Sequence, residues 1–105
     1  MANISAVVIT HNEEDNIKDC LQSISWAEEI IVIDAHSNDS TVEISRKFTD
    51  KVYLRKFDNF SAQKNYGLSK ASFDWILSID ADERVSGGLR KEIEEIVKDP
   101  STEEN

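Results

Sequence analysis

The chain has 105 residues with 12 basic and 21 acidic side chains, and its formal net charge is −9. This length suits one domain, and a hydrophobic fraction of 39% excludes a disordered acidic tail, because there is enough apolar surface to offset the ordering of the chain. The charge argues against a nucleic acid or an anionic membrane as the main partner, and an anionic small substrate would need a local cation or metal.

The first predicted elements are a buried strand and an amphipathic helix. Residues 4–9 form a short apolar run, which is typical of a strand buried on both faces and too short for a signal peptide or a membrane helix. We therefore expect no membrane segment and a cytoplasmic protein. Asn12 is the predicted N-cap of the helix, and Cys20, the single cysteine, is expected in the core and excludes an internal disulfide. The apolar face of the helix consists of Ile17, Cys20, Leu21 and Ile24.

Strand and helix signals continue to alternate through the middle of the chain. Residues 30–33 form a second buried run that ends at Asp34. Ser40 and Glu43 have the spacing of a capping box, which predicts the start of a second helix. Residues 51–56 alternate weakly between apolar and polar side chains and predict a third strand.

The same alternation predicts the last three elements. Residues 61–70 predict a helix, in which Gly67 costs about 1 kcal/mol relative to alanine. Residues 75–79 predict a fourth strand, which ends at Asp80. A final helix is indicated by an apolar stripe made of Leu89, Ile93, Ile96 and Val97.

This βαβαβαβα order predicts an α/β fold, a Rossmann-like three-layer sandwich with a mainly parallel sheet between helices. In such sheets ligands bind beyond the carboxyl ends of the strands, where the strand order reverses. We place the domain at residues 1–98 and a polar, flexible tail at residues 99–105.

Polar residues follow the first, second and fourth predicted strands. Residues 10–13 contain no glycine, which excludes a phosphate-cradling loop and a dinucleotide fingerprint. In residues 34–41, Asp34 suits either ligand contact or turn formation, and Asp39 is expected to cap a helix. Asp80-Ala81-Asp82 offers two carboxylates that could hold Mg²⁺ or Mn²⁺ beside a diphosphate. The alternative for these acids is helix capping and solvated turns.

Four blocks carry a resemblance to a known family. They are residues 4–16 (ISAVVITHNEEDN), 30–41 (IIVIDAHSNDST), 62–71 (AQKNYGLSKA) and 75–83 (WILSIDADE). The chain resembles the N-terminal, donor-binding half of family 2 glycosyltransferases with the GT-A fold, and in particular the bacterial lipopolysaccharide-core type. The resemblance implies an inverting, metal-dependent transferase that uses a nucleotide-diphosphate sugar, with UDP favoured, in cell-envelope polysaccharide or lipopolysaccharide synthesis.

The resemblance also implies roles for individual residues. Asp82 is the expected metal ligand, assisted by Asp80, which would also lie near the ribose and diphosphate of the donor. Ala35 stands where many members have a second Asp that binds uracil, so the identity of the donor's nucleobase is left undetermined. Members extend well beyond this length and carry the catalytic base there; no catalytic residue is identified in this chain, which is expected to be inactive alone. The implied substrate-binding residues are Thr10, His11, Asn12, Glu13, Asp34, Lys64 and Asp80.

Two other functions are weighed against this one. A non-catalytic α/β binding or scaffold module would keep the fold without the reaction. A phosphoacceptor receiver domain needs paired acids after the first strand, whereas this chain has Thr10-His11 there. We also expect a homodimer through surface that the rest of the family fold would cover, and a full-length protein that is peripheral to the inner membrane.

Overall fold

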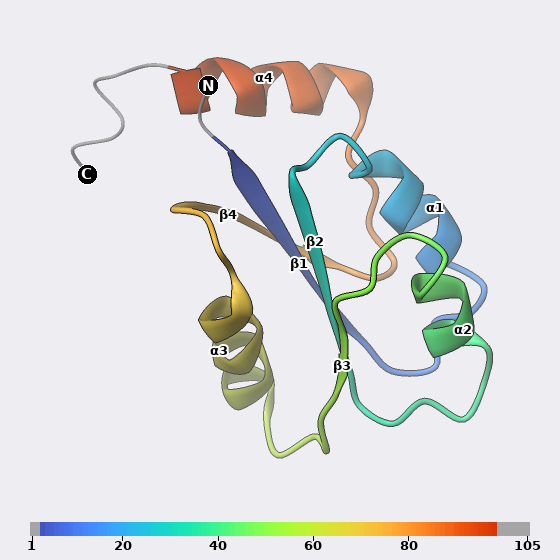
Figure 1. The fold of residues 1–105 in the computed structure, drawn as a ribbon. Helices are drawn as coiled ribbons and strands as arrows, with labels where there is room; N and C mark the ends of the chain where they lie inside the picture. Colours follow the sequence, from blue (N-terminus) through green and yellow to red (C-terminus); the bar gives the residue numbers. More distant parts are fainter. Residues whose placement is uncertain (1–2, 99–105) are drawn as a thin grey trace.

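A computed structural model describes residues 3–98, in which four strands alternate with four helices as predicted (Figure 1). The predicted tail at 99–105 lies outside the described residues. Within the described range, no helix is both long enough and apolar enough to span a bilayer. The elements are β1 (Ile4–Thr10), α1 (Ile17–Ser23), β2 (Glu29–Asp34), α2 (Thr41–Ser45), β3 (Val52–Leu54), α3 (Phe60–Lys70), β4 (Trp75–Asp80) and α4 (Gly87–Lys98).

The strands form one parallel sheet in the order β3-β2-β1-β4. Val8 in β1 pairs with Val32 in β2 and with Ile79 in β4, so the carboxyl ends of these strands lie at the same edge. Along the chain, β2 and β3 are added one after the other on one side of β1, and β4 is then added on the other side of β1. The order therefore reverses between β1 and β4, which is where α/β sheets bind ligands.

Helices cover both faces of the sheet, which confirms the predicted three layers. Helices α1 and α2 lie on one face and α3 lies on the other (Figure 1). The larger core joins the apolar side of α1 to Ala6 and Val8, and Cys20 is fully buried in it as expected. On the opposite face Val7 and Ile33 pack beneath α3, where Tyr66 covers them.

Helix α3 approaches the sheet through its only glycine. A Cβ at Gly67 would lie 2.5 Å from Cγ1 of Val7 and 3.2 Å from Cγ1 of Ile33. Gly67 therefore allows close contact between the helix and the sheet, although glycine has a lower helix propensity than alanine.

The outer side of β4 has no neighbour among the described strands, and Ile76 in this strand is 39% exposed.

One predicted helix start is wrong. Helix α1 begins at Ile17, and Asn12 is not its cap but a residue with a φ of 52°. The chain first makes a turn that is closed by a 3.0 Å hydrogen bond from the N–H of Asn16 to the carbonyl of Glu13, and this delays the helix.

Helix α2 begins at Thr41 with Ser40 at its N-cap position, as predicted, but the capping box does not form, because Ser40 makes no side-chain capping bond. The Asp39 carboxylate accepts from the N–H of Thr41 at 3.0 Å instead, which agrees with its predicted capping role. The third strand is also shorter than predicted. Residues 52–54 pair with β2, but the strand lies at the sheet edge, where no second partner among residues 3–98 extends it.

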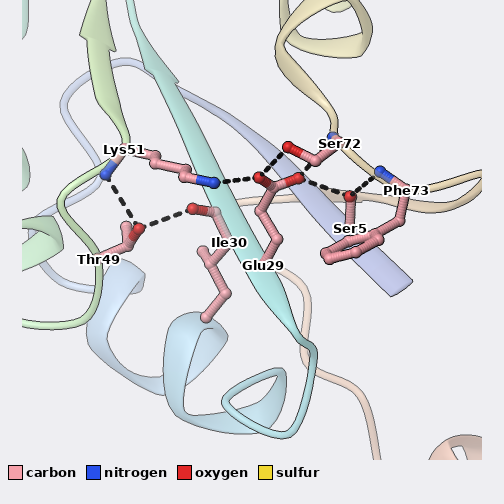
Figure 2. Close-up of polar contacts among 7 residues, drawn as sticks. All are labelled: Ser5, Glu29, Ile30, Thr49, Lys51, Ser72 and Phe73. Atoms are coloured by element: carbon pink, nitrogen blue, oxygen red, sulfur yellow. Dashed lines mark hydrogen bonds and ion pairs between the residues drawn. The ribbon is translucent and has the colours of Figure 1, made fainter. Parts of the chain in front are cut away.

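The buried carboxylate of Glu29 links several segments at the amino-terminal edge of the sheet (Figure 2). Glu29 accepts hydrogen bonds from the hydroxyl of Ser5 at 2.6 Å and from the N–H and hydroxyl of Ser72 at 2.8 Å each, and it pairs with Lys51. Burial alone would raise the pKa of Glu29, but the bonds from Lys51, Ser5 and Ser72 outweigh it and lower this pKa to about 2. One side chain thus fixes β1, β2, β3 and the α3–β4 connection.

Candidate functional site

A pocket of about 320 Å³ opens at the carboxyl edge of the sheet, where the strand order reverses. The ends of β1, β2 and β4 form its floor, and the segment between β3 and α3 contributes one wall. Its position is the one predicted from the strand and helix pattern. The lining residues are Ile9, Thr10, His11, Glu13, Ala35, Phe57, Phe60, Asp80, Ala81 and Asp82.

The loops that follow β1 and β2 hold each other in place. The Nδ1 of His11 lies 3.1 Å from the carbonyl oxygen of Ala35, so this nitrogen carries a proton and donates it. The N–H of Asn12 donates to Ser37 Oγ at 2.8 Å, and Asn12 Oδ1 accepts from the N–H of Asn38 at 2.8 Å. Asparagine suits this position because it tolerates a positive φ. Asn12 therefore shapes the rim of the pocket without lining it.

Asp34 lies beneath these loops and is fully buried. Its Oδ1 accepts from the hydroxyls of Thr10 at 2.7 Å and Ser37 at 2.6 Å, and its Oδ2 accepts from the N–H of Ser37 at 2.7 Å. Both carboxylate oxygens are used within the protein. Asp34 was predicted either to contact a ligand or to form a turn. The geometry favours turn formation, and the side chain positions the loops around the pocket.

The segment that we call the acidic loop, residues 80–85, follows β4. The N–H of Asp80 donates to Glu83 Oε1 at 2.9 Å, and the N–H of Glu83 donates back to the carbonyl of Asp80 at 2.9 Å. Ala81 is only 2% exposed and anchors the loop in the core, while Asp80 and Asp82 on either side of it are exposed. This alternation leaves two carboxylates free to meet a ligand.

Helix α1 holds the acidic loop from below. Cys20 Sγ donates to the backbone oxygen of the loop's first residue at 3.6 Å, and the N–H of Val85 donates to Ser23 Oγ at 2.9 Å. Arg84 forms an exposed 3.0 Å ion pair with Asp19. Burial and then the negative charges of the loop raise the pKa of the Cys20 thiol to about 12, which makes Cys20 a packing residue and not a nucleophile.

The donor set of the pocket suits a hard divalent cation that shares its ligands with a substrate. In residues 3–98 there is no group of three or more His, Cys, Asp or Glu side chains arranged to hold a metal by themselves. Asp80 and Asp82 line the same pocket, and Mg²⁺ commonly takes one or two protein carboxylates and completes its shell with water and phosphate oxygens. The two acids fit that pattern, and a pre-formed protein cage is not needed.

The structure brings five of the predicted site residues together. Thr10, His11, Glu13, Asp80 and Asp82 line the pocket. Asn12 and Asp34 support its loops from outside the lining, and Lys64 is half-buried on α3 and is not among the lining residues.

Sequence reasoning missed Phe57 and Phe60, which are 49% and 53% exposed at the wall of the pocket. They lie in no periodic pattern. Two large aromatic side chains in a polar segment directly after a predicted strand were the available signal.

Comparison with known proteins gives a consistent result. The sequence profile described as Glycosyl transferase family 2 matches residues 5–102. An uncharacterized glycosyltransferase of Rickettsia conorii is 39% identical over 94 residues, which cover 89% of this chain and 33% of that protein. A lipopolysaccharide core biosynthesis glycosyltransferase of Rhizobium meliloti, LpsC, is 30% identical over 99 residues, which cover 90% of this chain and 37% of that protein. The chain thus spans about a third of the length of these curated relatives.

Solved structures share the fold. TarS of S. aureus (residues 1–349) superposes with a TM-score of 0.72 at 23% identity, over 90% of this chain and 32% of that one. Mannosyl-3-phosphoglycerate synthase from Rubrobacter xylanophilus gives a TM-score of 0.72 at 22% identity, over 94% of this chain and 37% of that one. TarS has also been solved with UDP and with UDP-GlcNAc. At these identities the likeness establishes the α/β fold of the described residues.

Proposed function

Because this chain belongs to glycosyl transferase family 2, we propose that it is the donor-binding part of an enzyme that transfers a sugar from a nucleotide-diphosphate sugar to an acceptor hydroxyl. The observation that carries the proposal is the pocket at the reversal of the strand order, with Asp80 and Asp82 free at one side. The likeness to LpsC supports a role in cell-envelope polysaccharide synthesis, and the TarS complexes support a UDP-sugar donor.

The charge of the pocket decides how a diphosphate could enter it. Three of its lining side chains are the carboxylates Glu13, Asp80 and Asp82, and no Lys or Arg is among the described residues that line it. A diphosphate alone would be repelled. We propose that Asp82 and Asp80 hold Mg²⁺ or Mn²⁺, which when bound would neutralise the charge that develops on the departing nucleoside diphosphate.

The remaining steps divide between this chain and the rest of the parent protein. Asp34 keeps the loops after β1 and β2 in place, so that Thr10 and His11 present one side of the pocket to the nucleoside. We propose a single displacement with inversion at the anomeric carbon, in which a carboxylate from outside this chain removes the proton of the acceptor hydroxyl. Residues 1–98 would form the donor-binding unit of that cytoplasmic enzyme.

A calorimetric titration with UDP tests the proposal. We expect binding in the presence of Mn²⁺ and at least tenfold weaker binding with EDTA, because the carboxylates then face the diphosphate directly. Asp82→Asn should weaken Mn²⁺-dependent binding at least tenfold. Asp74→Asn is the matched control, since it removes the same charge from an exposed residue just before β4, on the opposite edge of the sheet.

The outcomes separate the proposal from its main alternative. If no nucleoside diphosphate binds with Mg²⁺ or Mn²⁺, the chain is better described as a non-catalytic α/β binding or scaffold module. If UDP binds equally well to Asp82→Asn, the metal role of Asp82 is wrong. Steady release of UDP from UDP-sugar by this chain alone would contradict the assignment of the base to another part of the protein.

A further inference from the structure

Two exposed phenylalanines occupy the wall of the pocket that β3 and α3 supply. Phe57 and Phe60 leave 49% and 53% of their surfaces open, although both contribute to the pocket lining. The residues between them are fixed: Asp58 pairs with Arg55 at 3.3 Å, and Asn59 caps α3 by accepting a 2.8 Å hydrogen bond from an N–H in its first turn. The two rings are therefore carried by a short segment that the cap at Asn59 attaches to the start of α3.

Most of the polar side-chain groups at the β2 side of the pocket already make hydrogen bonds within the protein. Asp34 is fully buried with both oxygens bonded, and the hydroxyl of Thr10 donates to it. Ala35 carries no polar side chain, and His11 uses Nδ1 on a backbone oxygen. Glu13 has one carboxylate oxygen without a hydrogen bond from the described part of the protein, since the side-chain amide of Asn16 donates to the other at 3.2 Å. This side of the pocket is thus poor in groups that could read the edge of a base.

The order of the strands separates the two ends of the pocket. Asp80 and Asp82 follow β4, β1 lies next to it, and Ala35 follows β2 on the far side of β1. Two strand spacings correspond to about 10 Å. A ligand that fills the pocket would therefore place its anionic group at the acidic loop and its other end beside Ala35 and the wall after β3, where the aromatic rings lie.

Resting on the donor-binding function proposed above, we infer that Phe57 and Phe60 form an aromatic platform for the nucleobase of the donor. Stacking on an aromatic ring contributes substantially to nucleotide binding and is tolerant of base identity, because every base has a flat π face. Affinity then depends on the rings more than on hydrogen bonds to the base edge. The site accepts a planar base attached to a diphosphate and discriminates weakly between bases.

Titrations of the whole chain with Mn²⁺ and UDP, GDP, ADP, CDP or inorganic pyrophosphate test this inference. We expect the four nucleotides to bind within about tenfold of one another. Phe57→Ala and Phe60→Ala should each weaken all four by about 5- to 20-fold, which is within the range for loss of one stacking contact. Pyrophosphate has no base, so its affinity should not change. Leu89→Ala is the control, because Leu89 is an apolar side chain on α4 that is 43% exposed and lies outside the pocket.

Each contrary result identifies a different error. If both phenylalanine variants bind UDP as the wild type does, the platform is absent and the donor site itself stands. If they weaken pyrophosphate as much as UDP, the rings maintain the shape of the pocket and do not stack on a base. A preference above 100-fold for one base that persists in both variants means that the base edge is read. If no diphosphate binds at all, the donor-binding function fails, and the platform with it.

Discussion

The contact of α3 with the sheet at Gly67 predicts that a favourable helix substitution will destabilise the protein. The added Cβ of Gly67→Ala would lie 2.5 Å from Cγ1 of Val7, whereas carbon atoms pack at about 3.5–4.0 Å, so one group must shift by about 1 Å. Val7 is fully buried on the central strand β1, and its branched side chain has few alternative rotamers. The strain therefore falls on the position of α3.

The expected magnitude follows from two opposing terms. Overpacking a core costs about 1–3 kcal/mol, and a contact of 2.5 Å with a fully buried side chain places Gly67→Ala in the upper part of this range, at about 2–3 kcal/mol. Replacing glycine by alanine within a helix returns about 1 kcal/mol, so we expect a net loss of about 1–2 kcal/mol. Gly88→Ala is the matched control, because a Cβ at that helical position meets nothing within 4 Å and should leave stability equal or raise it by up to about 1 kcal/mol. Urea unfolding followed by tryptophan fluorescence measures both. The reasoning is refuted if Gly67→Ala is as stable as the wild type.

Three other features give measurable expectations. Glu29→Gln should lower the free energy of unfolding at neutral pH by up to about 3 kcal/mol, because the pKa of Glu29 falls from 4.5 to about 2 on folding. A folded pKa below the unfolded one means that this stability is present above pH 4.5 and lost towards pH 2, so the acid sensitivity of the wild type in urea titrations should exceed that of the variant. Cys20 should react with a thiol reagent at pH 8 only after unfolding; rapid reaction of the native chain would contradict its burial. If the exposed side of β4 mediates the expected self-association, Ile76→Lys should abolish any concentration dependence in sedimentation, and a wild type that is monomeric at all concentrations would end that idea.

The alternation of strands and helices could be predicted because it depends on local hydrophobic periodicity. The buried runs in β1 and β2 and the apolar face of α1 are local features of this kind. The position of the pocket followed from the same alternation, since parallel strands place their carboxyl ends at one edge. The sequence therefore predicted Asp80 and Asp82 as candidate site residues, and both line the pocket.

The rest depends on contacts between distant segments. Glu29 reads as a polar residue before a strand, and its partner Ser72 is 43 residues away. Gly67 reads as a weak point in a helix until the strand beneath it is known. Asn12 suits a helix cap and a left-handed turn equally well, and the hydrogen bonds to the loop after β2 decide between them. Phe57 belongs to no hydrophobic periodicity in the sequence, and its place in the site is recognisable only once the pocket wall is known.

The attachment of the acidic loop to α1 has a consequence for how the site opens. Helix α1 has seven residues and no side-chain capping bond at its start, and isolated helices of that length are unstable in water. When α1 opens, its packing on the sheet must be lost together with the bonds that Cys20, Ser23 and Asp19 make with the acidic loop. The amide hydrogen of Val85 should then exchange with solvent through the same opening as the amides of the helix, with a similar degree of protection. A ligand that binds the loop would slow exchange along the helix beneath it.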